Sequence, residues 1–144
     1  MLGHHRPHNS FIDLGKQTVN TPLQTLGNMG KGERVLSGGR EATLFEHDGA
    51  GCLTHFWFGG NFDGVEDTRI RVYIDGEEAA SIDMQLYLGH GIGFNDNHAP
   101  WTTRHVGKVG KRNGLFNNYR IPFGQHVRVT AQRTPNAADD PQVW

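Results

Sequence analysis

The sequence has few of the features that mark metal, membrane or secreted proteins. Its single cysteine, Cys52, excludes an internal disulfide and a zinc module built from several cysteines, although it does not fix the compartment. No run of about 18 apolar residues occurs, and the opening residues, MLGHHRPHN, contain no apolar segment typical of a signal peptide. We therefore expect neither a membrane span nor an export signal.

An excess of either charge is also missing. The 14 lysines and arginines stand against 15 aspartates and glutamates, which gives a formal net charge of −1. The basic residues are scattered singly or in pairs and form no stripe, so nucleic acid is not a predicted partner. A length of 144 residues is that of one domain, large enough for a substantial core.

Glycine, by contrast, is abundant, with 20 residues, and apolar and polar residues alternate in several short stretches. The clearest alternation covers residues 68–74, after which Asp75 and Gly76 supply a two-residue turn and residues 81–88 return as a second strand. Further strands are expected at residues 42–48, 51–58, 115–123 and 125–133. No stretch shows a sustained helical period.

Six or so short strands predict an all-β protein, an antiparallel jelly-roll sandwich. Residues 1–39 are polar and rich in glycine, and we expect them to form an extended N-terminal arm before a jelly-roll domain at 40–144. An apolar stretch begins and stops at Val143 and Trp144, which suggests a truncated C-terminus. Residues 89–114 lack any period, so we expect a long loop with a function or an interface.

The predicted strand at residues 51–58 is apolar on both sides. Alternation places Leu53, His55 and Trp57 on one face, opposite Cys52, which we expect to be a core thiol. A strand that faces water should carry a polar row, so we expect the face with Leu53, His55 and Trp57 to be covered and to be an assembly interface. The cover is either the loop 89–114, a second sandwich or another subunit.

Four stretches resemble one known family in the right order. They are DGAGCLTHFW at 48–57, RIRVYIDGE at 69–77, LGHGIGF at 88–94 and YRIPFGQHVRV at 119–129. Together they resemble the first half of glycoside hydrolase family 172, typified by difructose-dianhydride-processing enzymes. The resemblance implies that the chain is the N-terminal half of a double jelly roll that assembles into trimers or larger rings.

The resemblance also implies that the catalytic glutamates of the family lie in the second half, so no residue of this chain is expected to be catalytic. The function predicted is the N-terminal jelly roll of a carbohydrate-active protein, itself inactive. The alternative is a structural jelly-roll subunit that assembles into rings or filaments without any chemistry. A homo-oligomer and a carbohydrate ligand are the partners expected.

A sugar site would need carboxylates and aromatic rings. Glycosidases hold two carboxyl groups about 5–5.5 Å or 6.5–9.5 Å apart, and acids in turns are usually only solvated. Asp96 is the best-placed acid, because its loop also carries His98 and Trp101; these three are the predicted substrate-binding residues. Trp101 and Tyr119 could stack on sugar rings, although aromatic residues of β proteins more often serve packing.

Neither a metal nor another cofactor is predicted. His90, Asp96 and His98 could in principle meet around zinc or iron, but the His-x-His pair of metal-binding cupins does not occur. Residues 49–51 and 27–32 contain fragments of glycine-rich nucleotide motifs without their full spacing, and the first leads into a strand where a phosphate site needs a helix.

Overall fold

The computed structural model describes residues 22–27, 34–36, 39–59, 64–93, 100–110, 114–133 and 142–143. The strands are β1 (Arg34–Val35), β2 (Glu41–Asp48), β3 (Gly51–Leu53), β4 (Phe56–Phe58), β5 (Arg69–Ile74), β6 (Ile82–Gln85), β7 (Trp101–Thr102), β8 (Val106–Lys108), β9 (Leu115–Asn117), β10 (Ile121–Phe123), β11 (His126–Gln132) and β12 (Gln142–Val143). One helical turn, α1 (Leu86–Gly89), follows β6. No helix within these ranges has the length and hydropathy needed to cross a membrane.

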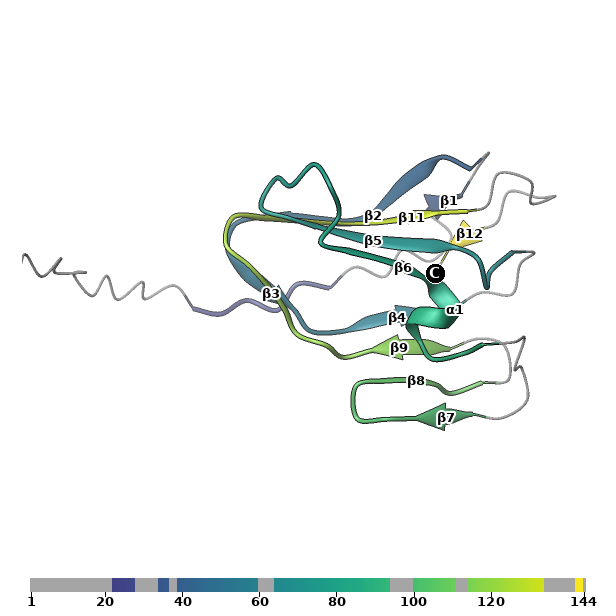
Figure 1. Ribbon diagram of the computed structural model, residues 1–144. Coiled ribbons are helices and arrows are strands. Elements are labelled where there is room, and N and C mark those ends of the chain that lie inside the picture. The colour runs from purple at the N-terminus through teal and green to yellow at the C-terminus, as the bar shows by residue number, and fades with distance from the viewer. Residues whose placement is uncertain are drawn as a thin grey trace, which may run out of the picture.

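Two antiparallel four-stranded sheets form the layers of the fold (Figure 1). The first sheet has the strand order β2-β11-β5-β6, and the second has the order β4-β9-β8-β7. Two short pairs, β3 with β10 and β1 with β12, accompany them. The predicted all-β antiparallel sandwich is therefore confirmed.

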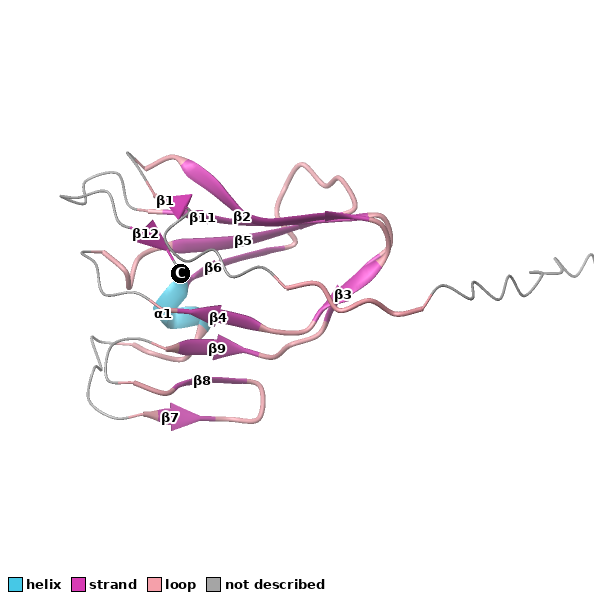
Figure 2. Cartoon of the chain, turned by 180° about the vertical axis from the view of Figure 1, so that it is seen from behind, coloured by secondary structure: helices cyan, strands magenta, loops and turns pink. Residues whose placement is uncertain are grey.

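One long ribbon belongs to both sheets. β2, β3 and β4 follow each other along the chain and pair in turn with β11, β10 and β9. The ribbon leaves the first sheet, bends at β3 and β10 and enters the second sheet, as both views show (Figures 1 and 2). At the bend Gly51 is essential, because a Cβ there would lie 2.5 Å from Cζ of Phe123.

The core lies where the inward rows of the two sheets meet. Its fully or almost fully buried side chains include Ile70, Val72, Val127, Val129 and Ala131 of the first sheet and Phe58 and Leu115 of the second. Leu36 is also fully buried in this cluster. Leu36 lies within the predicted N-terminal arm, and the boundary at residue 39 stays a prediction.

A β-bulge interrupts the pairing of β2 with β11. Val129 pairs with Phe45 and Thr130 pairs with Thr43, so that Leu44 is one extra residue on β2. A bulge of this kind bends its strand and increases the local twist. Its position on β2 matters because β2 is an edge strand of the first sheet.

The predicted hairpin at residues 68–88 pairs the expected strands, but the connection between them is longer and the second strand is shorter than predicted. β5 pairs antiparallel with β6, and Asp75 and Gly76 have the positive φ angles, 53° and 82°, that the turn requires. However, the last pair of the ladder is Val72 with Ile82, and residues 75–81 connect the two strands, which is more than two residues. The second strand ends at Gln85, and α1 follows, because the consecutive residues Leu86 and Tyr87 are both buried and a strand would turn one of them outward.

The expected loop at residues 89–114 contains two strands of the second sheet. β7 pairs with β8 and β8 pairs with β9, so this segment extends the sheet in its described parts. Whether the segment also covers β4, as predicted, stays a prediction, because residues 94–99 and 111–113 lie outside the described part of the chain. Strands of two and three residues are too short to show a readable alternation.

Asp75 joins the connection after β5 to the turn between β10 and β11. Its carboxylate accepts hydrogen bonds from the backbone N–H groups of Gly124, Gln125 and His126 at 2.6–3.0 Å. These bonds, with that of His126 first, hold the pKa of Asp75 below its ordinary value. The aspartate of the predicted turn therefore serves as an anchor for a second turn.

The bend of the ribbon gives a first prediction. Gly51→Ala places a methyl group against the ring of Phe123 and should lower the free energy of unfolding by about 1–3 kcal/mol in urea denaturation. The matched control is Gly93→Ala, whose Cβ would have its nearest contact at an ordinary 4.0 Å from Leu88. Equal midpoints for the two variants would contradict the steric explanation.

Candidate functional site

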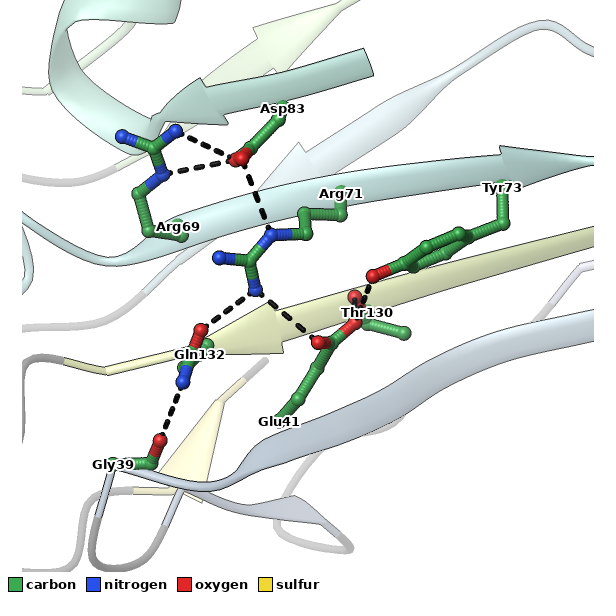
Figure 3. Close-up of polar contacts among 8 residues, drawn as sticks. All are labelled: Gly39, Glu41, Arg69, Arg71, Tyr73, Asp83, Thr130 and Gln132. Carbon is green, nitrogen blue, oxygen red and sulfur yellow. Dashed lines mark hydrogen bonds and ion pairs between the residues drawn. The ribbon is translucent and has the colours of Figure 1, made fainter. Parts of the chain in front are cut away.

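The outward side of the first sheet carries a network of charged and polar side chains, here called the polar face (Figure 3). It consists of Glu41, Arg69, Arg71, Tyr73, Asp83, Thr130 and Gln132. The predicted alternation of β5 and β11 places these side chains outward, since Ile70, Val72 and Val129 between them are buried. This is the densest group of ionisable residues in the part of the chain that the structure describes.

Arg71 is the centre of the polar face. Its Nη1 donates to Oε1 of Gln132 at 2.7 Å and lies 3.2 Å from Oε2 of Glu41, while its Nε lies 3.3 Å from Oδ2 of Asp83. The guanidinium group therefore connects β5 with β2, β11 and β6 (Figure 3). Its several donors in a fixed planar arrangement make this possible, which a lysine could not reproduce.

Glu41 accepts hydrogen bonds from the hydroxyl groups of Thr130 and Tyr73 and from Arg71. Partial burial acts to raise the pKa of Glu41, but the bonds from Thr130 and Tyr73 and the charges of Arg71 and Arg128 outweigh it, so the pKa lies below its ordinary value. Glu41 is consequently ionised at neutral pH and has no proton to donate.

Asp83 is held in the same state by arginine. Nε and Nη2 of Arg69 both lie 2.9 Å from Oδ1 of Asp83. The hydrogen bond from Arg69, and then the charge of Arg71, hold the pKa of Asp83 below its ordinary value. Both carboxylates on the two sides of Arg71 are thus ionised and paired.

This arrangement is unsuited to acid–base catalysis. Glycoside hydrolysis uses a carboxylic acid with a raised pKa, which protonates the leaving oxygen, and a second carboxylate across the reacting bond. In the polar face the space between Glu41 and Asp83 is occupied by Arg71, and both pKa values are lowered. The network connects four strands and leaves no open acid for a substrate.

The predicted substrate-binding residues fall in different places. Asp96 and His98 lie outside the residues that the structure describes. Trp101 lies in β7, partly buried, with Cζ2 of its indole 2.6 Å from where a Cβ of Gly91 would be. Across the ladder it pairs with Lys108, whose side chain is almost completely buried and was not singled out by the sequence. Substrate binding by these residues stays a prediction.

His90 is a core residue. It is fully buried, and its ring packs edge-on against Phe58 with the ring centroids 5.6 Å apart. Its Nδ1 lies 2.7 Å from the carbonyl oxygen of Leu86, which fixes the tautomer with the proton on Nδ1. Among the described residues, no three histidine, cysteine, aspartate or glutamate side chains come together as a metal site would require.

The predicted interface residues do not share one face. The strand expected at 51–58 is broken between Leu53 and Phe56, so period-2 alternation does not carry across the break. Leu53 pairs with Ile121 and packs against the core, whereas Trp57 faces outward and is 50% exposed. His55 is exposed, with Nδ1 2.6 Å from Oδ1 of Asn118. Placing Leu53 on the outward face was wrong, and the interface role of the three residues stays a prediction.

Cys52 corrects a second expectation from the same stretch. It is exposed and free, although the sequence suggested a core thiol. Its partner in the ladder, Pro122, is exposed as well, while Leu53 and Phe123 on either side of this pair turn inward. At the bend, therefore, Cys52 points outward and Leu53 points inward, the reverse of the faces expected for a straight strand.

A group of aromatic rings at the second sheet was not recognised as a group from the sequence, with Trp57, His105 and Tyr119 exposed and Phe116 partly exposed. It consists of Trp57, Phe116, His105 and Tyr119 and is here called the aromatic face. Trp57 pairs directly with Phe116, and the ring of Tyr119 stacks on His105 at 5.1 Å between centroids. The sequence does contain a signal, because Phe116 alternates with the buried residues Leu115 and Asn117, but only the register places Phe116 beside Trp57.

Burial of His90 gives a second prediction. Desolvation lowers the pKa of His90 from its ordinary value of 6.5, and the bond to Leu86 only partly offsets this. The unfolded chain then binds a proton more readily than the folded one, so the free energy of unfolding should fall as pH drops below about 6.5, by up to about 1.4 kcal/mol per pH unit.

The control for this prediction is His90→Asn, which keeps an N–H donor for the carbonyl of Leu86 and cannot be protonated. Urea denaturation between pH 7.5 and 5.5 should show a shallower loss of stability for the variant than for the original chain. The same slope in both proteins would show that His90 stays uncharged for another reason or is not buried in solution.

Comparison with known proteins agrees with this all-β architecture. A family model described as the GH172 first beta-sandwich domain matches residues 25–139, which span both sheets. A search of curated proteins finds no match to the chain. The resemblance to the first half of family 172 is confirmed, and the chain belongs to the family of GH172 first β-sandwich domains.

Proposed function

We propose that this chain is a non-catalytic domain of a carbohydrate-active protein, the first sandwich of a glycoside hydrolase whose catalytic carboxylates lie elsewhere. The family match supports the carbohydrate-active context. The observation that carries the non-catalytic half of the proposal is the state of the polar face, where Glu41 and Asp83 are ionised and both bound to Arg71.

The role of such a domain is to shape and hold a catalytic neighbour. The ribbon that pairs in both sheets joins them into one body. In this proposal the sandwich has the topology of a jelly roll. The second half of the double jelly roll supplies the catalytic acid and the nucleophile or base. The predicted residues Asp96, His98 and Trp101 then contribute at most to the rim of the substrate pocket.

The third prediction tests this inactivity. The purified 144-residue chain should release no reducing sugar from fructo- or arabino-oligosaccharides above the rate of buffer alone. Matched variants Glu41→Gln and Asp83→Asn should leave that background unchanged and lower only stability, by about 0.2–1 kcal/mol each, because their ion pairs are partly exposed. Turnover that disappears on Asp83→Asn or Asp96→Asn would overturn the proposal.

Assembly with further copies of the chain is the second candidate function. β3 carries Leu53, β4 carries Trp57, and His55 lies between the two strands. Within the described residues each of these strands has a partner on one side only. An edge strand with free backbone groups on its other side can pair with a strand of another chain. This edge is short and uncharged in its strands, which favours such pairing.

A fourth prediction follows for the oligomeric state. Sedimentation equilibrium should give a mass of three chains or more, in keeping with a ring. Thr54→Lys introduces a charge on the exposed segment between β3 and β4 and should shift the mass toward that of one chain without loss of β-sheet circular dichroism. A monomer at all concentrations would rule out assembly by the chain alone.

A further inference from the structure

We propose that the aromatic face binds an oligosaccharide by stacking sugar rings on Trp57, Phe116 and Tyr119. The inference deepens the proposed function and rests on it for the class of ligand, since the family match supports a carbohydrate-active context. The site is separate from the polar face, because it lies on the second sheet (Figure 2).

The register of the second sheet places an uncharged row across its outward side. Trp57 of β4 pairs with Phe116 of β9, Phe116 pairs with Gly107 of β8, and Gly107 pairs with Thr102 of β7. Residues directly opposite each other in a ladder have their side chains on the same face. The centre of the face is therefore two large rings followed by a glycine and a small hydroxyl side chain.

Two glycines allow these rings to lie close to the backbone. A Cβ at Gly107 would lie 2.8 Å from Cε1 of Phe116, and a Cβ at Gly114 would lie 3.3 Å from Cζ2 of Trp57. Rings that pack against glycine on one side keep the other side open, which agrees with the 50% exposure of Trp57. A larger residue at either position would displace the ring next to it.

A second pair of rings, His105 and Tyr119, lies where Asn118 continues the ladder of β8 and β9 opposite His105. Tyr119 is 51% exposed and lies nearly parallel to His105, with an angle of 16° between the rings. The backbone N–H of Asn118 donates to the carbonyl oxygen of His105 at 2.7 Å, and the side chain of Asn118 lies beside His55. Hydrogen-bonding groups thus stand next to the stacking surface.

This combination fits a sugar chain better than a protein partner. Protein interfaces are held by aromatic anchors that project and fill pockets, whereas the rings of Phe116 and Trp57 lie close to Gly107 and Gly114. A sugar ring has an apolar C–H face that matches the negative face of an aromatic ring, and hydroxyl groups at its rim that match His55 and Asn118. Residues 114, 116 and 118 follow one another on this side of β9 and its extension. They span about 14 Å, which suits a short oligosaccharide.

The test is isothermal titration calorimetry of the whole chain with fructo-, arabino-, xylo- and cello-oligosaccharides, which also identifies the sugar. At least one of these series should bind, and Trp57→Ala and Tyr119→Ala should each weaken that binding on the order of tenfold. Trp57→Phe keeps a ring and should lose less. The matched control is Leu88→Ala, which removes another exposed apolar side chain, on α1 and outside the aromatic face, and should bind as the original chain does.

Circular dichroism and the urea midpoint of each variant establish that it is folded, and Trp57→Phe keeps the test valid where the alanine variant does not fold. Absence of binding to every series, or binding that Trp57→Ala and Tyr119→Ala leave unchanged, would overturn the inference. A change of oligomeric mass on Trp57→Ala together with no sugar binding would assign the face to a protein partner. Turnover by the chain would refute the proposed function but not the stacking site, so the two failures are distinguishable.

Discussion

The structure depends on one paired ribbon that serves two sheets. Residues 41–58 run antiparallel to residues 115–132, first in one layer, then across the bend and then in the other layer. Every other strand of the two sheets adds to this ribbon, β5 and β6 beside β11, and β8 and β7 beside β9. The polar face lies on the sheet at one end of this ribbon, and the aromatic face lies on the sheet at the other end. The bend between them therefore sets their relative position.

The bend needs particular chemistry because the chain changes direction there without a helix or a disulfide. Gly51 lets the ring of Phe123 pack against the backbone, and Asp75 fixes the turn at Gly124 and Gln125 through backbone N–H donors. Both residues stand in glycine-containing stretches of the sequence that carried the family resemblance. Their importance is structural, in keeping with a domain whose carboxylates take part in holding strands together.

The sequence predicted the fold where alternation extends over enough residues. β5 and β11 are six and seven residues long and lie within the strands predicted at residues 68–74 and 125–133. β7 and β8 were missed because two or three residues cannot show a period. Leu53 and Cys52 were assigned to the wrong faces because the break at Thr54 and His55 cancels the parity between β3 and β4.

The candidate sites were less predictable, since each is made by residues that only the register brings together. Alternation could show that Arg71 points outward, but not that Glu41, Gln132 and Asp83 surround it. In the same way Trp57 was noticed in its own strand, while Phe116 and Gly107 became part of a surface only through the order β4-β9-β8. Pairing across long stretches of chain is the information that local patterns do not contain.

The bulge at Leu44 has a consequence for how the sandwich meets its neighbours. β2 is the longest edge of the fold, with eight residues, and a straight edge of that length invites strands from other molecules to add to it without limit. Because the bulge twists β2 partway along, an incoming strand cannot stay in register over its full length. The fold thereby protects its long edge against fibre-like growth.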